Sequence, residues 1–105
     1  MICADFRATA SGAGFTVQGH ADTAPAGEDI LCAAVSSAVY LTANTLTEIY
    51  GLSPDLSEHD GYFSLRFSDA DAYETAQPLL QGLCLHLLGL EEQYPDYIHI
   101  ERGAL

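Results

Sequence analysis

The chain has 105 residues, and its 15 acidic side chains against three basic ones give a formal net charge of −12 at pH 7. This length predicts a single domain over residues 1–105, and a hydrophobic content of 49% is sufficient for a core. The charge argues against direct nucleic-acid binding and against docking on anionic membranes, because both depend on clustered Lys and Arg. A partner selected by charge is therefore basic, unless the acidity only keeps the protein soluble.

The sequence shows none of the usual signals for export or membrane insertion. Its first residues contain no basic segment followed by an apolar one, and it has no run of about 18 apolar residues that would predict a membrane span. The three cysteines, Cys3, Cys32 and Cys84, are widely spaced and form no Cys-x-x-Cys motif. This pattern is typical of reduced thiols, so we expect a cytoplasmic protein.

The first part of the chain predicts a β-hairpin. Residues 2–8 alternate weakly between apolar and polar side chains, residues 11–14 form a glycine-rich turn, and residues 15–20 form the second strand. Residues 21–28 follow as a loop of small side chains without apolar periodicity. This loop is expected to connect the hairpin to a helix.

The helix is predicted to begin at Asp29 and to end before Gly51. The Asp29 carboxylate is a good N-cap, and a glycine commonly terminates a helix. Apolar side chains between these two positions recur at helical spacing, while residues 33–38 are unusually small. This end of the helix is therefore expected to approach a neighbouring backbone closely.

The second half predicts another hairpin, a second helix and a last strand. An Asp60-Gly61 pair separates two strand-like segments, as in a tight hairpin. A helix over about 71–94 carries leucines at helical spacing, and Pro78 should either kink it or delay its regular part to that point. With a strand at 97–101, the order is β-β-α-β-β-α-β. We expect a two-layer α+β domain, with both helices packed on one face of a mainly antiparallel sheet.

Cys32 is the first candidate for chemistry. If Asp29 caps the helix, Cys32 lies in the first turn, where unpaired backbone N–H groups favour an anion and hence the reactive thiolate. A thiol nucleophile also needs a proton acceptor, and His20 closes the preceding strand 12 residues earlier. The short loop between them allows both side chains to meet at one rim. A buried and inert helix cysteine is the simpler interpretation, and the spacing alone leaves it open.

The residues around this pair match those of a known family. The matching positions are Gly19-His20-Ala21-Asp22, then Gly27, Asp29-Ile30, Cys32-Ala33-Ala34 and Ser36. Weaker matches continue in the right order through Asn44, Asp60-Gly61, Phe63, Ala76-Gln77, Leu79-Leu80-Gln81, Glu91-Glu92 and Tyr94. Over nearly its whole length the chain therefore resembles the ribosomal-processing cysteine protease (Prp) family.

This resemblance implies a cytoplasmic, homodimeric cysteine endopeptidase that removes a short N-terminal extension from a protein of the large ribosomal subunit. The implied partners are a basic ribosomal polypeptide as substrate and a second copy of the chain, and no metal or other cofactor is implied. The family's catalytic cysteine falls on Cys32, and its catalytic histidine, the general base and acid, falls on His20. The other motif positions are candidates for supporting roles or for the substrate cleft: Gly19, Asp22, Gly27, Asp29, Ala33 and Ser36.

Several of these positions also have structural interpretations. Asp29 either caps the helix or orients His20. Ser36 lies four residues after Cys32, so it either lines the cleft or bonds back to the carbonyl of that turn. Backbone N–H groups around Cys32, Ala33 and Ala34 are candidate donors to the oxyanion of a reacting carbonyl.

Other sites carry weaker signals. Cys84 and His86 point to different sides of a helix, so no shared metal is expected and Cys84 is assigned to the core. His59 and His99 are expected to be surface or strand-pairing residues. The alternative function is a non-enzymatic dimeric module, or chaperone, that binds a basic ribosomal protein, with Cys32 serving only in packing.

Overall fold

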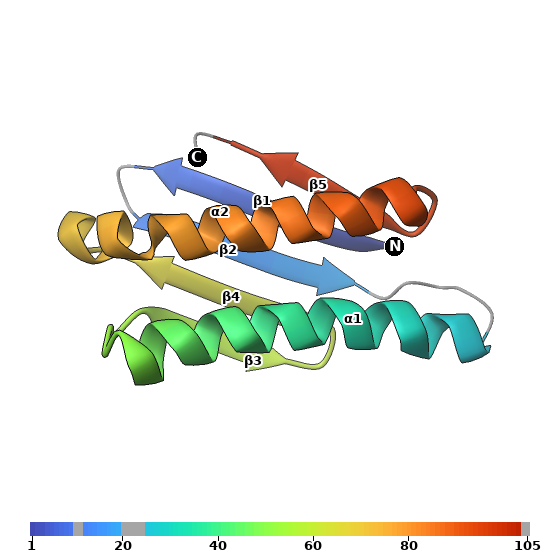
Figure 1. Ribbon diagram of the computed structural model, residues 1–105, viewed down its shortest axis with the longest axis horizontal. Helices are drawn as coiled ribbons and strands as arrows, with labels where there is room; N and C mark the ends of the chain where they lie inside the picture. The colour runs from blue at the N-terminus through green and yellow to red at the C-terminus, as the bar shows by residue number, and fades with distance from the viewer. Residues whose placement is uncertain (10–11, 20–24, 104–105) are drawn as a thin grey trace.

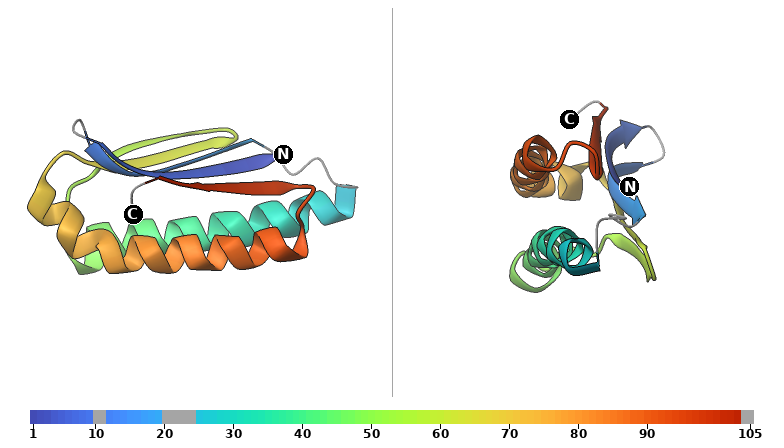
Figure 2. Two further views of the ribbon diagram at one scale, coloured as in Figure 1. Left: turned by 90° about the horizontal axis from the view of Figure 1, so that it is seen from above. Right: turned by 90° about the vertical axis from the view of Figure 1, so that its right-hand side faces the viewer.

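The computed structural model describes residues 1–9, 12–19 and 25–103. In chain order its elements are β1 (Ile2–Thr9), β2 (Gly12–Gly19), α1 (Pro25–Asn44), the π-helical turn η1 (Thr45–Ile49), β3 (Asp55–His59), β4 (Tyr62–Phe67), α2 (Ala70–Gln93) and β5 (Ile98–Arg102). The described strands form one sheet, and both long helices cover the same face of it (Figure 1, Figure 2). The predicted two-layer α+β architecture is confirmed.

The sheet has the strand order β3-β4-β2-β1-β5. The pairs β1–β2, β2–β4 and β3–β4 are antiparallel, and β5 pairs with β1 in parallel. Side chains alternate across each strand, so Ile2, Ala4 and Phe6 of β1 are buried under the helices whereas Cys3 and Arg7 are exposed on the other face. An antiparallel sheet commonly leaves one face to solvent. Any enclosed site must therefore lie on the helix-covered face or at its rim.

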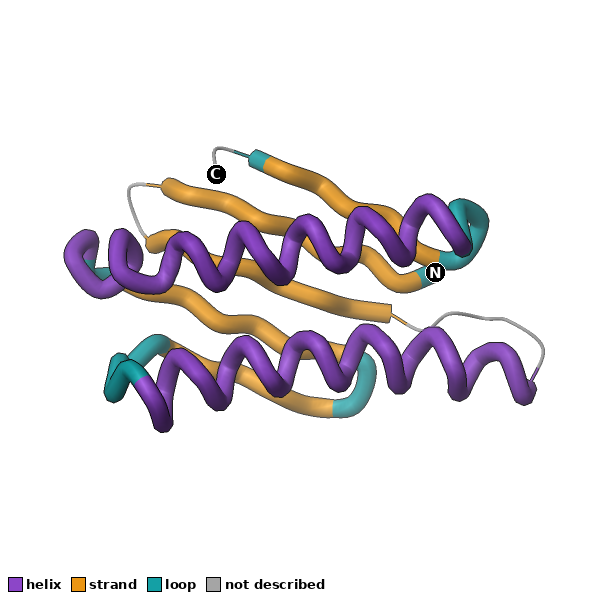
Figure 3. Tube along the Cα trace, viewed as in Figure 1, coloured by secondary structure: helices purple, strands orange, loops and turns teal. Residues whose placement is uncertain are grey.

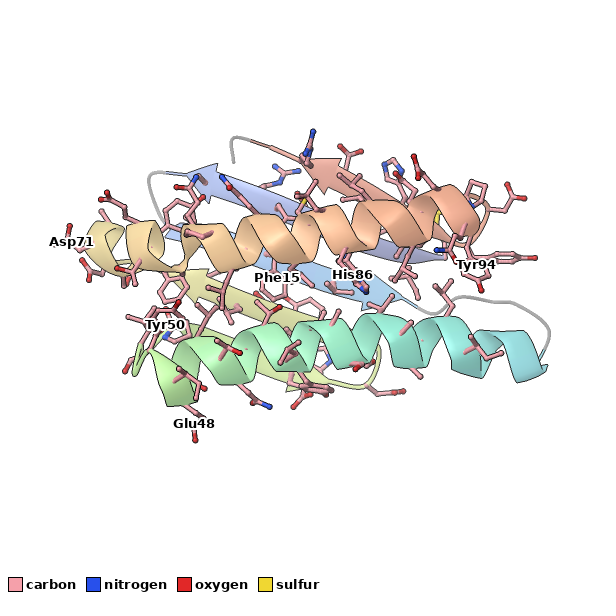
Figure 4. All side chains as sticks on the ribbon, in the orientation of Figure 1. Phe15, Glu48, Tyr50, Asp71, His86 and Tyr94 are labelled. Atoms are coloured by element: carbon pink, nitrogen blue, oxygen red, sulfur yellow. The ribbon has the colours of Figure 1, made fainter. Side chains whose placement is uncertain are left out.

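The core lies between the helices and the sheet. Helical spacing of three or four residues gives α1 a buried stripe that includes Leu31, Val35 and Val39. The buried stripe of α2 consists of Ala76, Leu80, Leu83, Cys84 and Leu87. Phe15 of β2 (labelled in Figure 4) is buried in this core, and its ring centroid lies 5.6 Å from that of Phe6. These contacts hold both helices against the sheet.

Strand β2 begins at Gly12 and not at residue 15 as predicted. The glycines that suggested a turn are needed inside the strand. A Cβ on Gly14 would lie 1.9 Å from the carbonyl oxygen of Leu65, so only glycine allows β4 to approach β2 this closely.

Helix α1 begins at Pro25, which makes the predicted start at Asp29 wrong by a full turn. Proline is well suited to the first helical position, because its missing N–H would have no partner there. At the other end the helix widens into η1, where the Tyr50 N–H donates to the carbonyl of Thr45 at 3.0 Å. Gly51 follows with φ +68°, a left-handed conformation that favours glycine, and the predicted stop before it is confirmed.

Helix α2 is continuous from Ala70 to Gln93 (Figure 3), so a delayed start at Pro78 is wrong. The Asp69 carboxylate caps it by accepting hydrogen bonds from the N–H groups of Asp71 and Ala72. Pro78 lies inside the helix, and Figure 2 shows the first turns at an angle to the rest. Proline cannot donate a helical hydrogen bond, so a bend at this point is expected. The hydrogen bonds to Asp69 at the start of the helix compensate for this loss.

By length and composition, Ile30–Ile49 is apolar enough to cross a membrane, with a mean hydropathy of 1.4. No such stretch was expected from the sequence, because serines, threonines, an asparagine and a glutamate interrupt its apolar run. One third of it is buried in the domain, and a core helix of a globular protein meets the same criterion. The stretch is therefore weak evidence for a membrane span.

Candidate active site

A cavity of about 260 Å³ lies between α1 and one end of the sheet. Its wall on α1 is formed by side chains spaced three or four residues apart, and its opposite wall by the ends of β1 and β2 and by the turn between β3 and β4. The lining residues are Cys32, Val35, Ser36, Val39 and Tyr40 on α1, and Ile2, 17–19 and 58–63 on the sheet.

Cys32 is partly buried and faces this cavity. It belongs to the same helical stripe as Val35 and Val39, but those two side chains are buried whereas Cys32 is partly exposed. Gly19, the last residue of β2, lines the same cavity, so this strand ends at the cavity that Cys32 faces. A partly exposed thiol on the wall of a cavity is accessible to a substrate.

Cys32 lies about two turns inside α1, because the helix begins at Pro25. Amide groups at this depth donate to carbonyls one turn earlier in a regular α-helix, which removes the predicted first-turn stabilisation of a thiolate. The N–H groups of Cys32, Ala33 and Ala34 are no longer free oxyanion donors, and Ala33 is exposed outside the cavity lining. Asp29 lies inside the helix and not at its N-cap.

The end of β2 forms part of the same cavity wall. Gly19 has φ +102°, and a Cβ there would lie 2.2 Å from the carbonyl oxygen of Met1, so both backbone conformation and space require glycine. Its N–H donates to the carbonyl of Gly61 at 2.9 Å, which ties β2 to the β3–β4 turn. The chain thus reaches the cavity directly before His20. His20 and Asp22 lie outside the described residues.

The hairpin of β3 and β4 supplies the opposite wall. The Tyr40 hydroxyl on α1 donates to the Glu58 carboxylate on β3, and the Tyr40 ring meets Phe63 edge-on at 5.8 Å. Strand alternation turns Glu58 toward α1 and His59 to the other side of the hairpin, where its ring stacks on Tyr62 at 4.6 Å. His59 is therefore poorly oriented to exchange a proton with Cys32.

The family model for "Cysteine protease Prp" matches residues 1–99 of the chain. The chain belongs to the Prp cysteine protease family. It is 33% identical over 96 residues to the ribosomal processing cysteine protease Prp of Bacillus subtilis (strain 168), covering 87% of this chain and 86% of the relative. The protein of the same name from Staphylococcus aureus (strain Mu50 / ATCC 700699) is 33% identical over 86 residues, or 80% of each chain.

Solved structures of Prp have the same fold. The essential ribosomal processing protease Prp from S. aureus in complex with a substrate peptide aligns with a TM-score of 0.82 at 27% identity, over 97% of this chain and 99% of the other. The same protease with a covalently linked product peptide aligns at 0.75 with 30% identity and the same coverage. The resemblance inferred from the motifs is confirmed, and the chain is a cysteine peptidase by family.

The Prp-type motif position Ser36 lines the cavity one turn after Cys32. The hydroxyls of Thr42, Thr45 and Thr47 bond back to carbonyls four residues earlier. Among the described atoms, no such bond joins Ser36 to the Cys32 carbonyl, so its hydroxyl is available to the cavity. Gly27 lies in the first turn of α1.

The other two cysteines of this Prp homologue differ sharply from Cys32. Cys84 is 1% exposed in the core, as predicted, and burial raises the pKa of its thiol although the Arg102 guanidinium partly opposes this. Cys3 is exposed on the open face of the sheet. Cys32 alone among the three combines partial exposure with a cavity wall.

Tyr40 and Glu58 were not predicted from the sequence as residues of the site. Neither residue carries a motif, and their contact joins positions 18 residues apart through the fold. The Asp60-Gly61 turn was recognised, but nothing in its local sequence indicates that it packs beside the end of β2. Both omissions concern non-local contacts.

Proposed function

We propose that this chain is an endopeptidase that removes an N-terminal extension from a protein of the large ribosomal subunit. The observation that carries the proposal is the position of Cys32, partly exposed on a cavity wall that also includes Gly19, the residue before His20. Relatives with this fold are named ribosomal processing cysteine proteases, and one was solved with a substrate peptide. Both facts support a peptide substrate for the same cavity.

In this proposal Cys32 is the nucleophile and His20 the general base and acid. His20 takes the thiol proton, and the sulfur attacks the scissile carbonyl to form a tetrahedral intermediate. Its collapse breaks the C–N bond, His20 protonates the leaving amine, and a thioacyl-enzyme remains. Water, deprotonated by His20, then releases the acid product and restores the thiol.

The oxyanion needs donors other than the N–H groups of α1, which are used within the helix. The Ser36 hydroxyl is a suitable donor, because it lines the cavity one turn from Cys32. We propose that it binds the reacting carbonyl or the adjacent peptide group. Ser36→Ala should then lower kcat/KM, and Ser36→Thr should restore part of it.

The net charge of −12 supports a basic substrate. Long-range attraction of a Lys- and Arg-rich chain acts over a Debye length of about 8 Å at physiological salt. The KM should therefore rise as salt is added, with kcat nearly unchanged. A salt-independent KM would assign the charge to solubility.

The direct test is cleavage of the extended ribosomal protein from the same organism, followed by mass spectrometry. Cys32→Ala and His20→Ala should each reduce cleavage by about a thousandfold or more, as the loss of a nucleophile or its base does. The matched controls are Cys3→Ala and His86→Ala, since both residues are exposed and outside the cavity lining. Equal activity of all four variants would refute the assignment.

A second candidate function is a non-enzymatic dimeric module that binds a basic ribosomal protein. The apolar residues exposed on and after α1, such as Leu41 at 70% and Ile49 at 78%, give it some support because they suit a protein contact. Binding without truncation, unchanged in Cys32→Ala, would favour it. Under both candidate functions we propose that the protein is cytoplasmic and forms a homodimer. Analytical ultracentrifugation tests the homodimer.

A further inference from the structure

The edge strand β3 runs into the proposed active-site cavity. It is the outermost strand on this side of the sheet, and all five of its residues are exposed. Its last two residues, Glu58 and His59, are part of the cavity lining together with Cys32. The open edge and the nucleophile therefore belong to one continuous surface.

Hairpin geometry shows which main-chain groups of β3 are free to pair. Asp60 and Gly61 form a two-residue turn, so the flanking pair His59–Tyr62 exchanges hydrogen bonds. Bonded and non-bonded pairs alternate from there along an antiparallel ladder. The N–H and C=O groups of Leu56 and Glu58 consequently point away from β4, toward the open edge.

The α1 wall of the cavity indicates how long a peptide segment fits along it. Cys32 and Tyr40 both line this wall, and their separation of eight positions corresponds to about 12 Å of helix. An extended peptide advances about 3.4 Å per residue, so three to four residues span this distance. Tyr40 and Glu58, which share a hydrogen bond, line the cavity about two helical turns from Cys32.

We propose that the substrate binds as an additional β-strand on the free edge of β3, with Leu56 and Glu58 pairing to its backbone and its scissile bond three to four residues from Tyr40. This inference rests on the proposed peptidase function and specifies how that site holds its substrate. The occupant is an extended, basic segment, because β3 and the turn after it carry three exposed acidic residues, Asp55, Glu58 and Asp60. Strand addition suits a protease, since it holds the backbone straight at the reacting bond.

Backbone pairing makes a prediction that side-chain recognition does not. In a strand, alternate N–H groups point to the same edge, so N-methylation of a synthetic substrate peptide should weaken binding with a period of two residues. Binding to the Cys32→Ala protein, measured by fluorescence anisotropy, should fall about tenfold at each pairing position and little at the positions between. A uniform loss, or no loss within four residues of the scissile bond, would overturn the proposal.

A protein variant tests the same contact from the other side. Leu56→Pro removes the outward N–H, whereas Leu56→Ala shortens the same side chain and keeps that group. We expect KM for Leu56→Pro to exceed that for Leu56→Ala by about tenfold, with kcat within about twofold. Thermal unfolding verifies that both variants fold. If Leu56→Pro does not fold, the N-methylated peptides decide whether the substrate pairs with β3. Equal KM values for two folded variants refute strand addition.

These experiments separate the inference from the function on which it rests. If the unmodified peptide is cleaved by the natural chain but not by Cys32→Ala, the peptidase assignment stands whatever the N-methyl series shows. If no extended substrate is cleaved, the function fails and takes the inference with it. Period-two binding together with cleavage supports both.

Discussion

The helices α1 and α2 lie side by side on the same face of the sheet, and each turns a cysteine toward it, but the two thiols have opposite properties. Cys84 of α2 is 1% exposed in the core, whereas Cys32 of α1 is partly exposed and lines a cavity together with Gly19, the last residue of β2. Both residues lie on the sheet-facing side of their helices. The difference teaches that the surroundings of a thiol, and not its helical position alone, decide whether a reagent can reach it.

Thiol labelling offers the largest contrast between the helices. In a Cys3→Ser background, we expect iodoacetamide to modify Cys32 at least about a hundredfold faster than Cys84, because burial hinders access and raises the pKa of the Cys84 thiol. Peptide mass spectrometry over time measures both rates. In urea the rates should converge; equal rates in the native protein would contradict the comparison.

Truncation of a core leucine tests how strongly the buried face of α2 stabilises the domain. Leu87 is fully buried, so Leu87→Ala should lower the free energy of unfolding by about 2–5 kcal/mol while leaving kcat per folded molecule unchanged. Leu85 is 65% exposed on the same helix, and Leu85→Ala should change stability by less than about 0.5 kcal/mol. Urea unfolding supplies the free energies. A comparable loss in both variants would mean that burial is not the cause.

Two glycines, Gly82 inside α2 and Gly19 at the active-site cavity, test what the backbone requires at each position. Nothing lies within 4 Å of a Cβ built on Gly82 in α2, so Gly82→Ala should stabilise the protein by about 0.5–1 kcal/mol through the lower entropy of the unfolded chain. The control is Gly19→Ala, where the positive φ and the Met1 carbonyl at 2.2 Å predict destabilisation together with lost cleavage. If Gly19→Ala stabilised the protein, the conclusion that backbone conformation and space require glycine before His20 would be refuted.

Local sequence signals predicted most of the architecture. Apolar periodicity placed both helices and their buried faces, and the Asp60-Gly61 pair located a hairpin turn whose glycine has φ +70°. The motif around Cys32 identified the family. These features depend on neighbours along the chain, which a sequence displays directly.

The remaining features depend on contacts between distant segments. Gly14 resembles a turn residue until the Leu65 carbonyl is seen beside it, and Pro25 resembles a loop residue although it suits a first helical turn. Because the helix begins one turn earlier than predicted, at Pro25, Cys32 lies further from the helix N-terminus than expected. The wall formed by Tyr40 and Glu58 was unpredictable for the same reason, since it joins α1 to β3.

The smallest expected effect concerns the attachment of β5 to α2. The Glu91 carboxylate on α2 accepts the N–H of Ile100 at 2.9 Å and lies 3.4 Å from Nδ1 of His99, whose Nε2 is 2.8 Å from the Glu101 carboxylate. The hydrogen bond to Glu101 raises the pKa of His99; desolvation opposes this effect, and the charges of Glu101 and Glu91 add to it. When His99 is protonated, its positive charge on β5 lies between the carboxylates of Glu91 and Glu101.

Because the folded pKa of His99 is raised, its stabilising contribution is complete below the unfolded value of about 6.5 and is lost as pH rises through the folded value. The urea midpoint of the natural chain should therefore exceed that of His99→Gln at pH 5.5, and the difference should shrink toward pH 8.5. His86→Gln is the control, an exposed histidine on α2 outside this cluster. The effect is small because solvent screens exposed pairs, so a difference that grows with pH, or one shared by His86→Gln, would show that this link does not hold β5 to α2.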